Sequence, residues 1–222
     1  MKILKLSTLS YIVILILFHS CKQGATKQDN FNNKANETTD STAQMKNNLP
    51  YTSDDVKPYY KLDADSTSYV VDSLYKGLVS RSFDEKNLSV PLKENDFNIQ
   101  LDSQYKYYIL KTFTFSDSHT AQVIIYNTFG ENDSKILNVQ LNSYVNNHLT
   151  DQLLLDCRFT FETEYYRTFK IGTDNSIEIV KHSVDGLEFN EAGDIVGEKK
   201  EADSAKVKVN YIIDSTGKFI KK

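Results

Sequence analysis

Two glutamates, Glu162 and Glu164, stand on either side of a single threonine at the end of a stretch of alternating apolar and polar residues. A pair of carboxylates is what glycoside hydrolysis needs, because one group works as the acid and the other as base or nucleophile. The same two charges at a connection between strands also keep a sheet edge soluble. The solubilising role is favoured, and hydrolysis by this pair is kept as the alternative.

The other residues that could do chemistry lack the spacing of a known site. Beyond residue 20 the histidines are His119, His148 and His182, and no two of them have the i, i+2 or i, i+4 spacing of a metal site. We expect them to be exposed, in or beside turns. The acidic stretch 185–198 lacks the alternating Asp and Asn of a calcium loop. With no phosphate loop or dinucleotide fingerprint either, the sequence predicts no metal and no organic cofactor.

Cys157 is expected to pack rather than react. Only one other cysteine occurs, Cys21, and it lies at the end of the N-terminal leader, so the folded part can form no internal disulfide. Cys157 falls on the apolar register of its stretch, where a thiol behaves as a small hydrophobic group. The sequence places no histidine to lower its pKa, so a catalytic role is disfavoured.

Tyrosine is the one enriched chemical type, with 14 residues. Tyrosine suits a half-buried sheet surface, and it also suits a binding face because it combines rigid contact area with a polar tip. The absence of tryptophan counts against a sugar-binding platform. Both interpretations stay open for the tyrosines on predicted strands, which are Tyr105, Tyr107, Tyr108, Tyr126, Tyr144, Tyr165, Tyr166 and Tyr211.

The stretch 153–161 is predicted to be the strand around which the folded part is organised. Its residues alternate between apolar and mostly polar, which is the period of a strand with one dry and one wet face. The apolar set is Leu153, Leu155, Cys157, Phe159 and Phe161, and the other set is Leu154, Asp156, Arg158 and Thr160. Similar stretches at 136–145, 165–171 and 176–184 are joined by short polar connections, which predicts an antiparallel meander.

The remaining patterns complete a mainly β fold. Further strands are predicted at 97–101, 105–115, 121–126 and 207–213, with hairpin turns at 190–193 and 214–217. Apolar residues at three- and four-residue spacing after Asp65-Ser66 predict one short N-terminal helix near 67–80, and a strand there is the alternative. The predicted fold is therefore an antiparallel meander that forms a twisted sheet or sandwich, in a single β-rich domain over residues 51–222.

The N-terminus has the layout of a signal peptide. Two positive charges in residues 1–5 precede a mostly apolar stretch at 6–18, which is too short to span a bilayer, and Ser20-Cys21 follows. Residues 1–20 are thus predicted to be removed. Residues 21–50 contain one aromatic side chain, Phe31, among many polar ones, so they are predicted to form a disordered tether.

This leader resembles the signal of bacterial lipoproteins, in which the cysteine becomes the acylated N-terminus. The resemblance implies a lipid such as palmitate on Cys21. Lys22 stands where Asp would imply retention in the inner membrane, which points to the outer membrane, and the absence of acidic residues after Cys21 favours its periplasmic face. The richness in Asn, Lys, Tyr and Ile is similar to lipoproteins of the Bacteroidota. In that group Asp40-Ser41-Thr42 resembles an O-glycosylation motif, which implies a glycan on Ser41.

Charge and composition limit the function further. The formal charge is −4 and no cluster of Lys and Arg suggests binding to phosphates, so nucleic acid is not expected as a partner. We expect a lipid-anchored protein of the cell envelope that works as a non-enzymatic binding or structural module for an envelope protein, lipid or glycan. The alternative is a periplasmic hydrolase that uses surface carboxylates such as Glu162 and Glu164.

The lipid anchor is directly testable. Cys21→Ser should release the protein from the membrane fraction or leave an unprocessed precursor, because the acyl chains would be its attachment to the bilayer. Metabolic labelling with a clickable fatty acid measures the modification. Equal labelling of Cys21→Ser and of the unaltered protein would contradict acylation at this cysteine.

Overall fold

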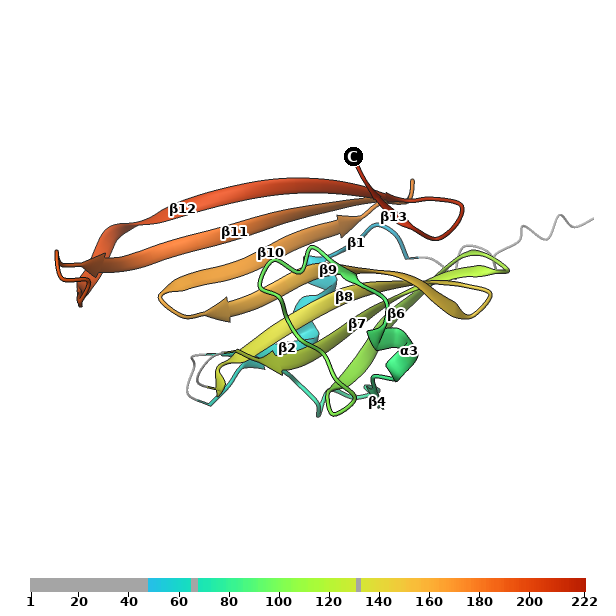
Figure 1. The fold of residues 1–222 in the computed structure, drawn as a ribbon, viewed down its shortest axis with the longest axis horizontal. Helices are drawn as coiled ribbons and strands as arrows, with labels where there is room; N and C mark the ends of the chain where they lie inside the picture. Colours follow the sequence, from blue (N-terminus) through green and yellow to red (C-terminus); the bar gives the residue numbers. More distant parts are fainter. Residues whose placement is uncertain (1–47, 65–67, 131–132) are drawn as a thin grey trace, which may run out of the picture. The chain divides into compact units, whose positions relative to one another are not determined.

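The fold, seen in a computed structural model that describes residues 48–64, 68–130 and 133–222, is one long antiparallel meander (Figure 1). Its strands lie side by side in chain order and form an open sheet. They are β6 (Lys106–Ser116), β7 (His119–Phe129), β8 (Lys135–Val145), β9 (His148–Thr160), β10 (Thr163–Ile171), β11 (Ser176–Phe189), β12 (Ile195–Ile213) and β13 (Phe219–Lys221). The predicted fold class is confirmed. The leader, Cys21 and Ser41 lie outside the described residues.

Shorter elements occupy the first part of the domain. They are β1 (Tyr51–Thr52), α2 (Ser53–Val56), the 3-10 helix η1 (Lys57–Tyr59), β2 (Tyr60–Leu62), β3 (Tyr69–Val71), β4 (Ser80–Ser82), α3 (Glu85–Leu88) and β5 (Leu92–Lys93). Strand β4 pairs with β6, β1 with β10, and β5 runs parallel to β9, while β2 and β3 form a separate ribbon. In the part of the chain that the structure describes, no helix has the length and apolar character needed to cross a membrane.

Two local predictions are wrong. The described part of 67–80 is not a helix, because the β-branched pair Val70 and Val71 joins β3 and pairs with β2. The short helical segment lies earlier, at 53–59, where the Asp55 carboxylate accepts the Thr52 N–H at 2.7 Å. Residues 97–101 alternate like a strand but form a loop instead.

The side chain of Asn95 stabilises the loop at 97–101. The side-chain amide of Asn95 exchanges two hydrogen bonds with the backbone of Ile99, at 2.7 and 3.0 Å. Asn98, inside this ring, has a φ of 50°. Asn adopts such conformations and competes with strand pairing by bonding to nearby backbone. The alternation of Phe97, Ile99 and Leu101 is therefore not a sign of strand pairing.

Both predicted hairpin turns are confirmed. Gly193 has a φ of 87° and donates its N–H to Asn190 O at 3.0 Å. Gly217 has a φ of 77° and donates to Asp214 O at 3.0 Å. A side chain at Gly217 would also meet Val145 at 2.7 Å. This turn therefore requires glycine for its conformation and for close packing.

A β-bulge in β9 changes which of its side chains face the core. Leu153 pairs with Leu141 and Asp156 pairs with Val139, so β9 holds one residue more than β8 between these two pairs. Leu155 lies in this interval, and both Leu153 and Leu155 belong to the main core. Because the side-chain period of a strand is two, one extra residue exchanges the two faces of everything that follows.

The predicted dry face of 153–161 is therefore wrong beyond Leu155. Cys157 packs in a different cluster on the opposite face, with Phe159 beside it, and the Phe161 side chain is 62% exposed. The predicted wet positions Asp156 and Arg158 turn inward, where the Arg158 guanidinium lies 5.1 Å from the ring of Tyr69 on β3. This cation–π contact holds the β2–β3 ribbon against the sheet.

One core cluster contains residues from every strand between β6 and β13, together with Tyr51 of β1 and Val56 of α2. The Tyr51 ring connects two separate strands of this core, because it packs against Phe113 of β6 at 5.6 Å and against Phe169 of β10 at 6.5 Å between ring centroids. The sheet is therefore folded over its own inner face, with the N-terminal segment inserted between β6 and β10.

This folding requires β9 and β10 to separate. The two strands pair only where residues 159–160 of β9 lie opposite residues 164–165 of β10. Beyond that point the edge of β10 finds other partners. The Arg167 N–H donates to the Asp156 carboxylate at 2.6 Å, the Phe169 N–H donates to the Ser53 hydroxyl at 2.7 Å, and β1 pairs with residues 170–171. The edge of β9 is filled by β5, which pairs with residues 152–153. The backbone groups freed by the separation are thus satisfied.

The altered register gives a stability prediction. Phe113→Ala should lower the free energy of unfolding by about 3 to 5 kcal/mol, because the side chain is 0% exposed and its removal leaves a cavity. Phe161→Ala should change it by less than about 0.5 kcal/mol, because that side chain faces solvent. Urea unfolding of both variants measures the difference. Equal midpoints would show that Phe161 belongs to the core after all.

Candidate functional site

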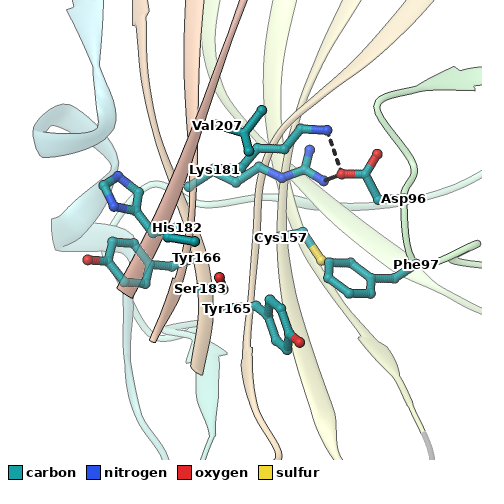
Figure 2. A pocket seen from close by; sticks show the side chains of 11 residues that line it. Asp96, Phe97, Cys157, Tyr165, Tyr166, Lys181, His182, Ser183 and Val207 are labelled. Carbon is teal, nitrogen blue, oxygen red and sulfur yellow. Dashed lines mark hydrogen bonds and ion pairs between the residues drawn. The ribbon is translucent and has the colours of Figure 1, made fainter. Parts of the chain in front are cut away.

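A hollow of about 170 Å³ lies on one face of β10, β11 and β12, beside the segment 94–97 that leads from β5. We call it the aromatic hollow. Its walls are Phe97, Cys157, Tyr165, Ser183, Ala205 and Val207, and Asp96, Arg167 and Lys181 form its charged end. Figure 2 shows the Cys157 sulfur against the Phe97 ring and Lys181 reaching toward Asp96.

Three aromatic rings build one wall of the hollow. Phe97 lies edge-on to Phe159 and to Tyr165, at 4.8 and 5.1 Å between ring centroids, and Phe159 stacks on Tyr165 at 5.1 Å. Such contacts are favourable beyond the area they bury and fix the orientation of each ring. Phe97 still remains 41% exposed, and Val207 on the opposite wall is 57% exposed. The hollow is therefore a preformed apolar surface open to solvent.

An ion-pair network at the charged end fixes segment 94–97 over the sheet. Lys181 Nζ lies 2.5 Å from both the Asp96 and the Glu94 carboxylates. The Arg167 guanidinium donates to Asp96 at 3.1 Å, to Glu94 O at 2.9 Å and to Leu154 O at 3.1 Å. Arg167 is 2% exposed, so its charge is matched by groups inside the protein.

The pKa of Glu94 is strongly shifted by this network. Burial alone would raise its pKa, but hydrogen bonds from Lys181, Tyr211 and Lys221 outweigh burial and lower the pKa to about 2. The carboxylate is thus held charged, with the Tyr211 hydroxyl and Lys221 Nζ on one oxygen and Lys181 on the other. This arrangement anchors the loop and does not leave a free acid or base.

Cys157 is buried, as expected for a residue that packs and does not react. It is 1% exposed, and burial raises the pKa of its thiol to about 12. The thiol is therefore neutral at neutral pH and serves as an apolar wall of the hollow. The prediction that Cys157 is buried is confirmed, although the side chain lies on the opposite face from Leu153.

The structure does not bring Glu162 and Glu164 to the hollow. They flank the tight turn between β9 and β10, where Phe161 N–H donates to Thr163 O at 3.3 Å. Together with Lys199 and Lys200 they line an open groove at the start of the β11–β12 extension. Among the described residues neither carboxylate has a hydrogen bond or an ion pair to another side chain.

The three histidines do not share one environment. His148 is exposed, as predicted. His119 is buried, which the sequence did not predict. Its Nε2 lies 3.0 Å from Ser143 Oγ, and burial lowers its pKa. His182 is half-buried and stacks on Tyr166 at 4.5 Å, and both residues are among those that line the hollow (Figure 2). Within the described residues, no group of three or more His, Cys, Asp or Glu side chains could hold a metal.

The tyrosines divide between core and surface cavities. Tyr126 and Tyr211 are buried, Tyr165 lines the aromatic hollow, and Tyr107 and Tyr144 line a second, polar cleft of about 670 Å³. Charged and amide side chains from β4, α3 and β7 complete this polar cleft. The packing interpretation is therefore confirmed for the buried tyrosines, and a binding role for the tyrosines that line the cavities stays a prediction.

Tyr144 connects the polar cleft to a hydrogen-bond network of buried side chains. Gln140 accepts from the Tyr126 hydroxyl and donates to Asn142 at 2.6 Å and Gln152 at 2.7 Å, and Asn142 donates to the Tyr144 hydroxyl at 3.3 Å. Groups already paired in this way gain little from a new ligand. We take the aromatic hollow as the stronger candidate, because its walls are apolar and open to solvent, whereas the lining of the polar cleft is largely charged or polar.

Sequence reasoning missed the residues that define the hollow. Arg167 and Lys181 stand at positions that their own strands turn inward, because Phe169 and Ile171 share the face of Arg167, and Ile179 shares that of Lys181. A charged residue in the inward register of a strand is the signal that could have indicated them. Phe97 carries no such signal, because only the folding of 94–99 brings it over the sheet.

Glu94 makes the stability of the protein depend on pH. Because its folded pKa is lowered to about 2 from an ordinary 4.5, its stabilising effect is complete above about pH 4.5 and is lost as the pH falls toward 2. The gap in unfolding free energy between the unaltered protein and Glu94→Gln should narrow by about 3 kcal/mol over this range. Urea unfolding at several pH values measures it, with Glu191→Gln in the exposed turn as control. Parallel pH profiles for the unaltered protein and Glu94→Gln would contradict the network.

Comparisons of the chain with protein-family models, with curated proteins and with solved structures find no match. What the aromatic hollow binds is therefore inferred from its own residues.

Proposed function

We propose that this protein is a lipid-anchored binding module of the cell envelope, and that the aromatic hollow receives one apolar side chain of a partner protein. The observation that carries this proposal is the size and lining of the hollow. A space of about 150 Å³ lined by apolar side chains is known to accept benzene. The hollow, at about 170 Å³, therefore fits a group of the size of a phenyl ring or a branched aliphatic side chain.

The surroundings of the hollow favour a peptide over a free hydrocarbon. The apolar walls supply the driving force for burying a side chain. At one end of the hollow, the polar atoms of the Asp96 ion pairs could also form hydrogen bonds with a peptide backbone. An apolar anchor held in a preformed pocket with a polar rim is the usual core of a protein interface. The exposed Phe97 and Val207 extend the contact area beyond the hollow itself.

The anchor and tether inferred from the sequence agree with this role. A lipid on Cys21 would hold the domain near the periplasmic face of the outer membrane, and the polar residues 22–47 would let it search for partners within reach of that surface. A binding module needs no catalytic groups, and the groups around the hollow are engaged in ion pairs or packing. For a hydrolase centred on Glu162 and Glu164, the carboxylates line an open groove together with Lys199 and Lys200 and not an apolar hollow.

A small probe tests the hollow. N-acetylphenylalaninamide should cause saturable chemical-shift changes at the methyl groups of Ala205 and Val207. Val207→Glu should abolish the changes at Ala205, because a carboxylate beside the aromatic wall is unfavourable without a partner. Ile195→Glu, an exposed apolar position on the same strand and away from the hollow, is the matched control and should bind the probe as well as the unaltered protein.

Two results would contradict the proposal. One is a set of shift changes spread equally over Ile195, Val196 and the hollow, which would indicate nonspecific contact with exposed apolar groups. The other is equal binding of N-acetylglutaminamide, which would show that the site does not select an apolar side chain.

A further inference from the structure

The edge of β12 next to the hollow has no strand partner in the described chain. Strand β13 covers only residues 211–213 of β12, and the Lys222 N–H donates to Asn210 O at 2.9 Å where this cover ends. From Asp203 to Val209 the strand pairs with β11 alone. On the other side of this segment the register of β11 and β12 shifts sharply, from Asp185 opposite Asp203 to Leu187 opposite Glu198. The free edge is therefore bounded at both ends.

The backbone groups on this edge can be assigned by alternation. Asn210 O and the Asp214 N–H face β13, while the Ile213 N–H faces the β11 side. In an antiparallel ladder residues alternate between the two neighbours, so the N–H and C=O of Ser204, Lys206 and Lys208 point out from the sheet. Residues 200–208 are all exposed. An extended, exposed strand with outward backbone groups is a template for another strand.

The side chains of the free edge differ between its two faces. On the hollow face, Ala205 and Val207 line the aromatic hollow. On the opposite face stand Lys206 and Lys208, across from His182 and Val180 of β11. Lys208 pairs with Glu178 at 2.6 Å, whereas no carboxylate of the described residues forms an ion pair with Lys206. The edge is thus apolar on one face and basic on the other.

We propose that this edge, from Asp203 to Val209, receives an extended segment of a partner protein as an added antiparallel strand. The segment carries acidic side chains opposite Lys206 and Lys208, and opposite Val207 it carries the apolar side chain that enters the aromatic hollow. The inference rests on the proposed function and specifies the kind of partner. Strand addition supplies affinity through backbone hydrogen bonds and specificity through alternate side chains.

The geometry of an antiparallel pair agrees with this assignment. Outward-facing residues form hydrogen-bonded pairs, and the residue between them, Val207, forms a pair without backbone hydrogen bonds, in which side chains come closest. The Cβ of an aromatic residue opposite Val207 therefore lies about 5 Å from the Val207 Cβ. Its ring is long enough to extend past Val207 into the hollow. The added strand continues the line of β13 beyond Lys222.

The lysines argue against a second copy of this chain as the occupant. Two β12 edges paired antiparallel around Lys206 or around Val207 would place lysine opposite lysine, and like charges directly opposite each other are destabilising. Lysine on an exposed edge is also a common protection against self-association. An acidic partner instead neutralises Lys206.

The probe for the test is an acetylated and amidated hexapeptide, Val-Glu-Phe-Glu-Val-Glu, which spans the positions opposite Val209 to Ser204. It is added to the full-length protein in detergent, and amide hydrogen exchange is followed by NMR. Exchange should slow at Ser204, Lys206 and Lys208 and stay unchanged at Ala205 and Val207, whose N–H groups already face β11. The same peptide with Lys in place of Glu should bind more weakly.

Two variants of one residue separate the backbone contribution from the charge. Lys206→Ala should weaken binding about two- to fivefold, since it removes one exposed charge pair. Lys206→Pro should weaken binding by at least about tenfold more, because proline lacks the outward N–H and its ring occupies the edge. Proline is tolerated at an edge position whose N–H faces solvent, and unchanged exchange in β11 verifies the fold. Ser204→Pro, at the next outward position, repeats the test.

The outcomes distinguish the two proposals. Equal binding by Lys206→Ala and Lys206→Pro, or unchanged exchange at Ser204 and Lys206, overturns strand addition even if the phenylalanine probe still enters the hollow. Loss of probe binding at the hollow overturns the proposed function itself. Alternating protection that appears without peptide and grows with protein concentration overturns the acidic partner in favour of a second copy.

Discussion

The fold depends on the contact between Arg167 and Asp156 at the point where β9 and β10 separate. Opening a sheet between neighbouring strands frees backbone N–H and C=O groups, and a buried group without a partner is costly. Here the Asp156 carboxylate accepts the Arg167 N–H, and the Arg167 guanidinium returns to Leu154 O of β9 and to Glu94 O. The hydrogen bonds of Asp156 and Arg167 therefore take the place of strand-pairing hydrogen bonds between β9 and β10. They allow the meander to fold over its own inner face.

The aromatic hollow follows from this separation. The bulge beside Asp156 turns Cys157 and Phe159 to the face where Phe97 lies, and Arg167 and Lys181 hold the segment that carries Phe97. The same curvature returns β13 toward β9, where the Phe219 N–H donates to the Asp151 carboxylate at 2.8 Å. Among the described strands, β13 pairs only with residues 211–213 of β12, and the edge of β12 before them is unpaired. The hollow and this strand edge thus lie side by side.

Most of the meander was predictable because its signals are local. Alternation along 136–145 and 176–184, and the glycines at 193 and 217, depend on residues adjacent in the chain, and all of them were interpreted correctly. The errors arose where distant partners decide the outcome. Val70 and Val71 form a strand because β2 is there to pair with them, and His119 is buried because Ser143 and the turn at Gly217 enclose it. No pattern within either segment records those neighbours.

The sequence by itself determined the class of fold, its antiparallel meander, the packing role of Cys157 and the expectation of a signal peptide before a polar tether. Each of these follows from composition or from a period of two residues. The tertiary structure decided the face of Phe159, the inward charges of Arg167 and Lys181, and the place of Phe97. The physical reason is that a single extra residue in β9 reverses the faces of a strand, and the cost of burying Arg167 is offset only by carbonyls and carboxylates far away in the sequence.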